Sequence, residues 1–167
     1  MKKVSLLLAS LLFFPLLAQA GDRDVLVKVV LTPAGDFEIT GLVNGKGKET
    51  KDKSGKSVYI AQNLTVSVGG MKTGLETRDK HLHKTFKKGT EDEVLVKKAV
   101  CNPADKSGKG IITINGKDDA FNFTCQKEGN SMTAKFKLNL STFGIKASYM
   151  SVGVEDEVNV EAHVPLE

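Results

Sequence analysis

The sequence predicts an all-β protein, an antiparallel β-barrel of about eight strands with one short α-helix. Apolar residues recur at every second position in several separate segments, which is the pattern of strands that bury one face. Some of these segments are about seven to eleven residues long, at or above the usual length of a strand. A sheet with one apolar face must close into a barrel or fold into a sandwich to hide that face, and the long strands favour the barrel.

Residues 1–20 are predicted to be a secretory signal peptide. Two lysines follow the first methionine, an apolar run covers 6–17, and Ala18 and Ala20 frame a small-x-small cleavage site. The apolar run is too short to span a bilayer comfortably. We therefore expect a mature barrel domain over residues 21–167 that is exported and, in a cell with two membranes, periplasmic.

Composition and motifs argue against nucleic-acid binding and catalysis. Loss of the two signal-peptide lysines lowers the formal net charge from +4 to +2, and the lysines of 46–56 are typical of a solvated loop without interleaved aromatic residues. The sequence has no Gly-x-Ser-x-Gly elbow, no metal-ligand spacing and no carboxylate pair in an apolar context. We expect a protein that is not an enzyme and that binds no metal, cofactor or nucleic acid.

Turn signals divide the chain into the expected strands. Residues 32–35 separate the first two strands, and a Gly/Lys-rich loop over 44–56 follows the second. Turns at 102–109 and 115–119 frame the first strand of a hairpin, and the cleanest alternation of all covers 132–141. The expected strands cover residues 25–31, 37–43, 58–68, 94–100, 111–114, 121–125, 132–141, a short segment ending at 150 or 152, and 158–164.

The alternation stops between the third and fourth expected strands, where we predict a helix over 74–86. Three apolar side chains fall at roughly helical spacing there: Leu75, Leu82 and Phe86. Asp79 interrupts this stripe. Thr73 followed by Glu76 fits a capping box, in which a hydroxyl and a carboxylate satisfy the first backbone N–H groups of a helix. A helix inserted among strands is either a lid or a plug.

Two cysteines, Cys101 and Cys125, are the only ones in the chain, and in an exported protein they favour a disulfide. If each ends a strand, and the two strands are two places apart in a meander, their backbones lie about 10 Å apart. A disulfide needs Cα atoms within about 7 Å. The bond therefore requires Cys101 to lean over the end of the sheet together with the loop that follows it.

Three separated motifs carry a family resemblance. They are Lys72-Thr73-Gly74 with Arg78-Asp79-Lys80-His81-Leu82 and Phe86, then Gly110-Ile111-Ile112-Thr113-Ile114-Asn115-Gly116, and finally Phe143-Gly144-Ile145 with Val152-Gly153-Val154-Glu155-Asp156-Glu157-Val158. In order and spacing they resemble the signature of the YceI-like family, exported lipocalin-like barrels that bind polyisoprenoid lipids. The resemblance covers roughly residues 30–164.

The resemblance implies a barrel that holds a polyisoprenoid, such as a prenyl quinone or a prenyl phosphate, for transport or storage, with transient contact with a membrane. The residues expected to contact the ligand are Leu64, Val66, Leu75, Arg78, His81, Leu82, Phe86, Phe121, Phe123, Phe136, Leu138, Leu140 and Phe143. In the alternative interpretation these apolar side chains fill the core, and the barrel is a non-enzymatic module that binds a protein partner. The sequence does not indicate the oligomeric state.

Polar residues of the helical segment have two interpretations. Arg78 can hold a phosphate or polarise a quinone carbonyl, or it can pin the helix to the barrel together with Asp79. The place of Asp79 on the apolar stripe favours a structural contact. His81 and His83 are two residues apart, which points them to opposite sides of a helix and argues against a shared metal ion. His163 is expected to face solvent with no clear partner.

Overall fold

The computed structural model describes residues 24–32, 35–86, 92–146, 148–149 and 152–167. The predicted signal peptide lies outside the described residues. Within them, no helix has both the length and the hydropathy needed to cross a bilayer.

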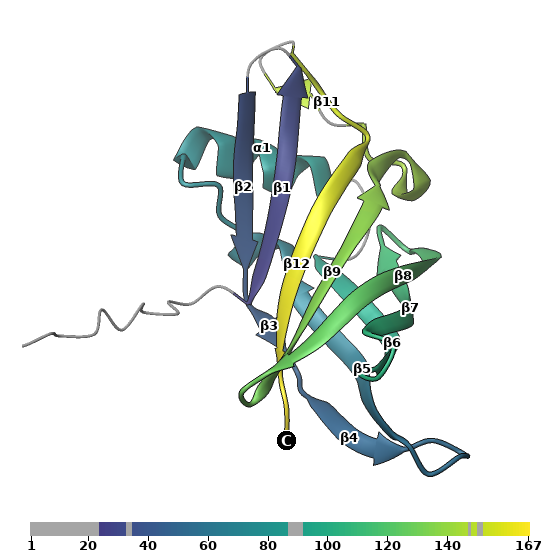
Figure 1. Ribbon diagram of the computed structural model, residues 1–167. Helices are drawn as coiled ribbons and strands as arrows, with labels where there is room; N and C mark the ends of the chain where they lie inside the picture. Colours follow the sequence, from purple (N-terminus) through teal and green to yellow (C-terminus); the bar gives the residue numbers. More distant parts are fainter. Residues whose placement is uncertain (1–23, 33–34, 87–91, 147, 150–151) are drawn as a thin grey trace, which may run out of the picture.

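The described residues fold into an antiparallel barrel with one α-helix, which confirms the predicted class (Figure 1). In this part of the chain the sheet has twelve strands rather than about eight. The strands are β1 (Val25–Thr32), β2 (Gly35–Gly41), β3 (Val43–Asn44), β4 (Gly47–Lys51), β5 (Ser57–Ser67), β6 (Glu93–Asn102), β7 (Ser107–Ile114), β8 (Lys117–Glu128), β9 (Ser131–Asn139), β10 (Ser148–Tyr149), β11 (Val152–Val154) and β12 (Glu157–Pro165). The helices are α1 (Glu76–Phe86) and the short 3₁₀ turns η1 (Val68–Gly70) and η2 (Leu140–Phe143).

The barrel closes through a continuous stretch of chain that changes its pairing partner. From β1 the sheet runs through β12, β9, β8, β7 and β6 to β5, and all of these neighbours are antiparallel. On the other side, β2 pairs with β1 along its whole length, whereas β3 and β4, which follow it directly, pair with β5. The segment β2–β4 therefore crosses from one edge of the sheet to the other and closes it (Figure 1).

Two loops predicted from composition are shorter than expected. The Gly/Lys-rich segment 44–56 contains β4, which pairs with β5 from Gly47 opposite Ala61 to Lys51 opposite Ser57. The turn predicted over 102–109 ends early, because β7 begins at Ser107. Ladder hydrogen bonds join backbone groups, so a hairpin that extends into solvent needs no apolar face, and hydropathy does not reveal it.

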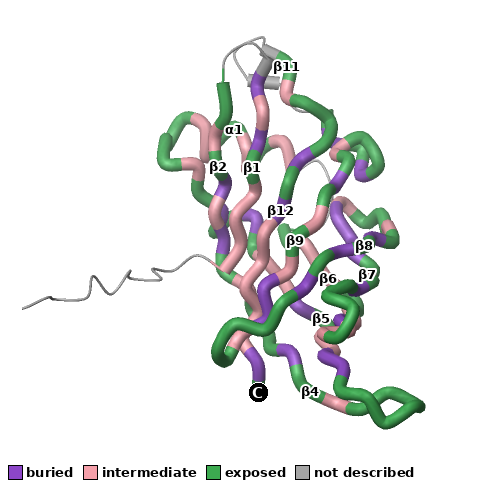
Figure 2. The backbone as a smooth tube through the Cα atoms, viewed as in Figure 1, coloured by how far each residue is buried: buried purple, intermediate pink, exposed green. Residues whose placement is uncertain are grey.

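Buried residues recur along the inner face of the long strands, with exposed residues between them (Figure 2). In β8, for example, Phe121, Phe123 and Cys125 are buried and their neighbours in the chain are exposed. In β12, Val158 and Val160 are buried and Asn159 between them is exposed. The period-two pattern read from the sequence therefore identifies the inner face of the barrel.

Cys101 and Cys125 are joined by a disulfide, with their Cα atoms 6.2 Å apart. The separation of about 10 Å expected for strands two places apart is wrong here. Cys101 is opposite Gly108 of β7, but Cys125 lies one residue beyond the point where β7 begins, and its backbone N–H donates to the carbonyl of Lys106 in the turn. Because no full β7 strand stands between the two cysteines, the ends of β6 and β8 approach each other.

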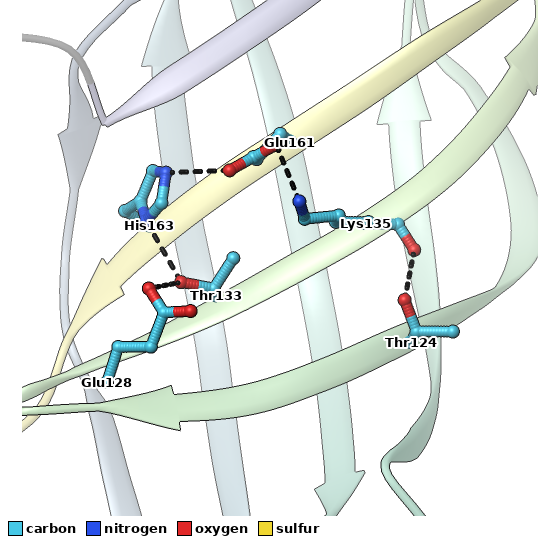
Figure 3. A network of polar contacts seen from close by, with 6 residues as sticks. All are labelled: Thr124, Glu128, Thr133, Lys135, Glu161 and His163. Atoms are coloured by element: carbon cyan, nitrogen blue, oxygen red, sulfur yellow. Dashed lines mark hydrogen bonds and ion pairs between the residues drawn. The ribbon is translucent and has the colours of Figure 1, made fainter.

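A polar network covers the outer face of β8, β9 and β12 (Figure 3). The hydroxyl of Thr133 donates to Glu128 Oε2 at 2.9 Å and lies 3.0 Å from His163 Nδ1. His163 Nε2 lies 3.2 Å from Glu161 Oε1, and Glu161 also pairs with Lys135. The expectation that His163 lacks a partner is therefore wrong, because cross-strand pairing places Thr133 directly opposite it.

We predict that replacing both cysteines by serine lowers the free energy of unfolding by about 3 kcal/mol, since the bond closes a loop between residues 24 positions apart. Urea denaturation of the wild-type protein and of the Cys101→Ser, Cys125→Ser double variant measures this. Reduced wild-type protein should match the double variant. Equal stability of the oxidised wild type and the variant would contradict the prediction.

Candidate ligand-binding cavity

The barrel contains a partly open cavity of about 210 Å³ between the inner faces of the strands and α1. Eleven of the thirteen residues predicted to contact a ligand line it: Leu64, Val66, Arg78, His81, Leu82, Phe86, Phe121, Phe123, Phe136, Leu138 and Leu140. Inward-facing side chains such as Val66, Val96 and Phe136 are half-buried rather than buried, because they border this space. A fully packed core, as the alternative interpretation requires, would bury them.

Two predicted residues, Leu75 and Phe143, do not line the cavity. Leu75 precedes α1 by one residue and is 50% exposed, because the helical stripe begins only after it. Phe143 ends η2 and is 1% exposed within the packed core. The chain reverses at Gly144, whose φ is 72°, and it is Ile145, which sequence reasoning missed, that borders the cavity.

Small side chains explain why the interior is hollow. Ala61 of β5 is opposite Ala99 of β6, and Ala134 of β9 is opposite Ala162 of β12. All four line the cavity and are half-buried. Where larger side chains would meet across a barrel of this size, methyl groups leave space. Sequence reasoning missed these residues, although alanines at inward positions of the alternation were a readable signal.

Polar side chains enter the described wall of the cavity mainly from one segment of the chain. Thr73, Arg78, His81 and Thr85 all belong to α1 or to the turn before it. The strands contribute apolar residues, apart from Tyr59, whose hydroxyl donates to Glu49. Arg78 is the one Lys, Arg, Asp or Glu among the described residues of the wall. The cavity therefore has an apolar body and one polar side, as an amphiphile requires.

Arg78 is held over an aromatic ring of the barrel. The central carbon of its guanidinium lies 4.4 Å from the centroid of the Phe37 ring in β2, a cation–π contact, and its Nε atom is buried. His81 and Thr85 follow at the third and seventh positions, so the three side chains share one side of α1. Sequence reasoning identified Arg78 and His81 but not Phe37, which only the fold places beside them.

Asp79, and not Glu76, ties the turn that precedes α1 to the helix. Asp79 Oδ1 accepts hydrogen bonds from the backbone N–H and the hydroxyl of Thr73, each at 2.6 Å. Partial burial acts to raise the pKa of Asp79, but these two hydrogen bonds outweigh it and lower the pKa below its usual value. Glu76 instead pairs with Lys80 on the surface at 2.7 Å. The predicted capping box is wrong because Gly74, at φ 81°, turns the chain before the helix begins.

The attachment of α1 to the barrel consists largely of such local polar contacts. His83 Nε2 lies 3.0 Å from the carbonyl oxygen of Met71, to which it can donate, and Lys72 pairs with Thr40 of β2 through two backbone hydrogen bonds. Leu82 and Phe86 pack against the core, yet no residue of α1 is buried. The helix covers the cavity without the packing that holds the strands.

The model of the YceI-like domain family matches residues 26–166. Among solved structures, BcnA from Burkholderia cenocepacia is similar with a TM-score of 0.56 at 16% identity, covering 84% of this chain and 94% of its own. A mutant CJ YCEI protein with a monobromobimane guest has a TM-score of 0.48 at 20% identity, covering 73% of this chain and 81% of its own. Among curated proteins, none matches the sequence.

We predict that Asp79→Ala lowers the free energy of unfolding by about 1–2 kcal/mol at neutral pH, because it removes the two hydrogen bonds that tie Thr73 to α1. The folded-state pKa of Asp79 is depressed, so its contribution is present above the unfolded-state pKa and is lost as the pH falls through the folded-state pKa. Thermal unfolding at neutral and at acid pH should therefore show a difference that disappears in acid.

Glu76→Ala is the matched control for this measurement. The Glu76 side chain is 81% exposed, and we expect its removal to change the stability by less than about 0.5 kcal/mol. An effect of Glu76→Ala as large as that of Asp79→Ala would contradict the assignment of this stabilising contact to Asp79 alone.

Proposed function

The chain belongs to the YceI-like family, and we propose that it is an exported protein that binds a polyisoprenoid lipid in its barrel, for transport or storage. One observation carries the proposal: among the described residues, the strands line the cavity with apolar side chains apart from Tyr59, and the other polar side chains lie beside α1. Such a cavity suits a ligand with a long hydrocarbon tail and one polar head group. Export to the periplasm rests on the predicted signal peptide and on the family.

Burial of the tail supplies most of the binding free energy in this proposal. Each methylene-sized group removed from water contributes about 0.8 kcal/mol, so a tail of many carbons binds tightly without polar contacts. The aromatic rings of Phe121 and Phe136, whose centroids are 4.6 Å apart, offer a broad apolar contact to such a tail. The isoprenoid nature of the tail comes from the family resemblance.

A long tail requires the cavity to widen. Its volume of about 210 Å³ is smaller than the roughly 300–1,000 Å³ of typical pockets for drug-sized ligands. Strands held by continuous ladders resist displacement, whereas α1 has no buried residue. It contacts the barrel through two half-buried apolar side chains, Leu82 and Phe86, and through polar contacts such as that of His83 with Met71. We infer that α1 moves outward to admit the ligand and that it forms the entrance.

The head group is proposed to lie beside Arg78. A guanidinium can hold a phosphate by charge-assisted hydrogen bonds or polarise a quinone carbonyl. The hydroxyl of Thr85 donates to the carbonyl of His81, so the oxygen of the Thr85 hydroxyl can still accept a hydrogen bond from a ligand. These groups bind and orient a ligand, and we propose a binding role rather than catalysis.

We expect the mature protein, purified gently from the periplasm, to carry a stoichiometric adduct with isoprene mass spacing in native mass spectrometry. Ala134→Leu should abolish the adduct because the larger side chain fills the space beside Ala162. Ala120→Leu, the same change at an exposed position of β8, should retain it. A bare wild-type mass that is unchanged after incubation with prenyl quinones and prenyl phosphates would overturn the proposed function.

We predict that Arg78→Gln weakens the binding of geranylgeranyl phosphate roughly tenfold while leaving the binding of the uncharged alcohol, geranylgeraniol, nearly unchanged. Lys84→Gln removes the same charge from an exposed position of α1 and should affect neither ligand. Fluorescent-probe displacement measures both affinities. An equal loss for the phosphate and the alcohol would show that Arg78 shapes the wall and does not bind the head group.

A further inference from the structure

We propose that two glycines of β7, Gly108 and Gly110, set the width of the cavity by accommodating the rings of Phe123 and Phe121. Gly110 begins the second family-like motif but, unlike Ile112 and Ile114 of the same motif, it does not line the cavity. The inference rests on the proposed function, because width matters only if the cavity binds a chain.

The register places each glycine directly opposite one phenylalanine. Gly108 pairs with Phe123 and Gly110 with Phe121 in the antiparallel ladder of β7 and β8. Opposite residues in such a ladder point to the same side of the sheet, and both phenylalanines line the cavity. A side chain at either glycine would therefore also point into the barrel.

Each ring occupies the space of the missing side chain. A Cβ atom at Gly110 would lie 2.6 Å from Phe121 Cε1, and one at Gly108 would lie 2.2 Å from Phe123 Cζ. Ordinary contact begins at 3.4 Å, so the Phe121 ring would have to retreat by about 0.8 Å. Both rings thus lie flat across β7 rather than upright in the interior.

Neighbouring rings limit where a displaced ring can go. The Phe121 centroid is 4.6 Å from that of Phe136 and 5.4 Å from that of Phe123. Movement along the wall is therefore blocked on both sides, and the remaining direction leads into the cavity. Substitution of Gly110 would narrow the space in which a chain lies.

The width discriminates between chains of equal length. A methyl-branched chain has a larger cross-section than a straight one, so it is the first to be excluded when the wall moves inward. We therefore expect the glycines of β7 to permit branched, isoprenoid-like chains in particular.

The test compares two alcohols of twenty carbons, branched geranylgeraniol and straight 1-eicosanol, by displacement of N-phenyl-1-naphthylamine. Gly110→Ala should weaken geranylgeraniol binding at least tenfold and 1-eicosanol binding less than threefold. Gly153→Ala is the matched control, because a Cβ there would meet no atom within 4 Å. Adding Phe121→Leu to Gly110→Ala removes the displaced ring and should restore binding of the branched alcohol.

The outcomes separate this inference from the proposed function. Failure of the wild-type protein to bind either alcohol or any prenyl compound would overturn the proposed function itself. If Gly110→Ala binds both alcohols as tightly as the wild-type protein does, the proposed role of the glycine is overturned but the proposed function is not. A Cβ at Gly110 would also lie 3.0 Å from the carbonyl oxygen of Lys98, so folding must be checked. If Gly110→Ala does not fold, a folded, ligand-binding double variant supports the inference, and an unfolded one overturns it.

Discussion

The change of pairing partner between β2 and β4 is the constraint on which the rest of the structure depends. Because this segment leaves β1 to join β5, the sheet closes and its apolar face is enclosed. After the crossing, Gly45, at φ 117°, turns the chain between β3 and β4, at a place where a Cβ would lie 2.8 Å from Leu64 Cδ2. The outer edge of β2 is bridged instead to Lys72 through Thr40, and α1 follows directly from that bridge.

The wall of the cavity is consequently of two kinds. The strands form a rigid part, stabilised by continuous ladders and by the Cys101–Cys125 disulfide. The helix forms a second part, attached by hydrogen bonds of Asp79 and His83 and by the contact of Arg78 with Phe37. Local contacts of this type open at a lower free-energy cost than a sheet does, so the polar side of the cavity coincides with its most adaptable side.

The interior stays hollow because the barrel is lined unevenly. Alanines meet across β5 and β6 and across β9 and β12, and aromatic rings lie flat on the glycines of β7. Packing is otherwise close, as the 1% exposure of Val68 and Phe143 shows. The same fold with larger residues at these few inward positions would have a filled core. The size of these side chains, and not the strand topology, therefore produces the cavity.

The sequence by itself determined the barrel class, the inward-facing residues of the long strands and the position of the helix. These features follow from the regular alternation of side-chain direction along a strand and its helical repeat along a helix, both of which are set by the local backbone. Only the tertiary structure decided which inward residues border the cavity, that Phe143 is packed away from it, that Phe37 meets Arg78, and that Asp79 accepts hydrogen bonds from Thr73. The reason is physical: an unfilled volume depends on side chains that come from strands far apart in the chain, and local periodicity contains no information about their distances.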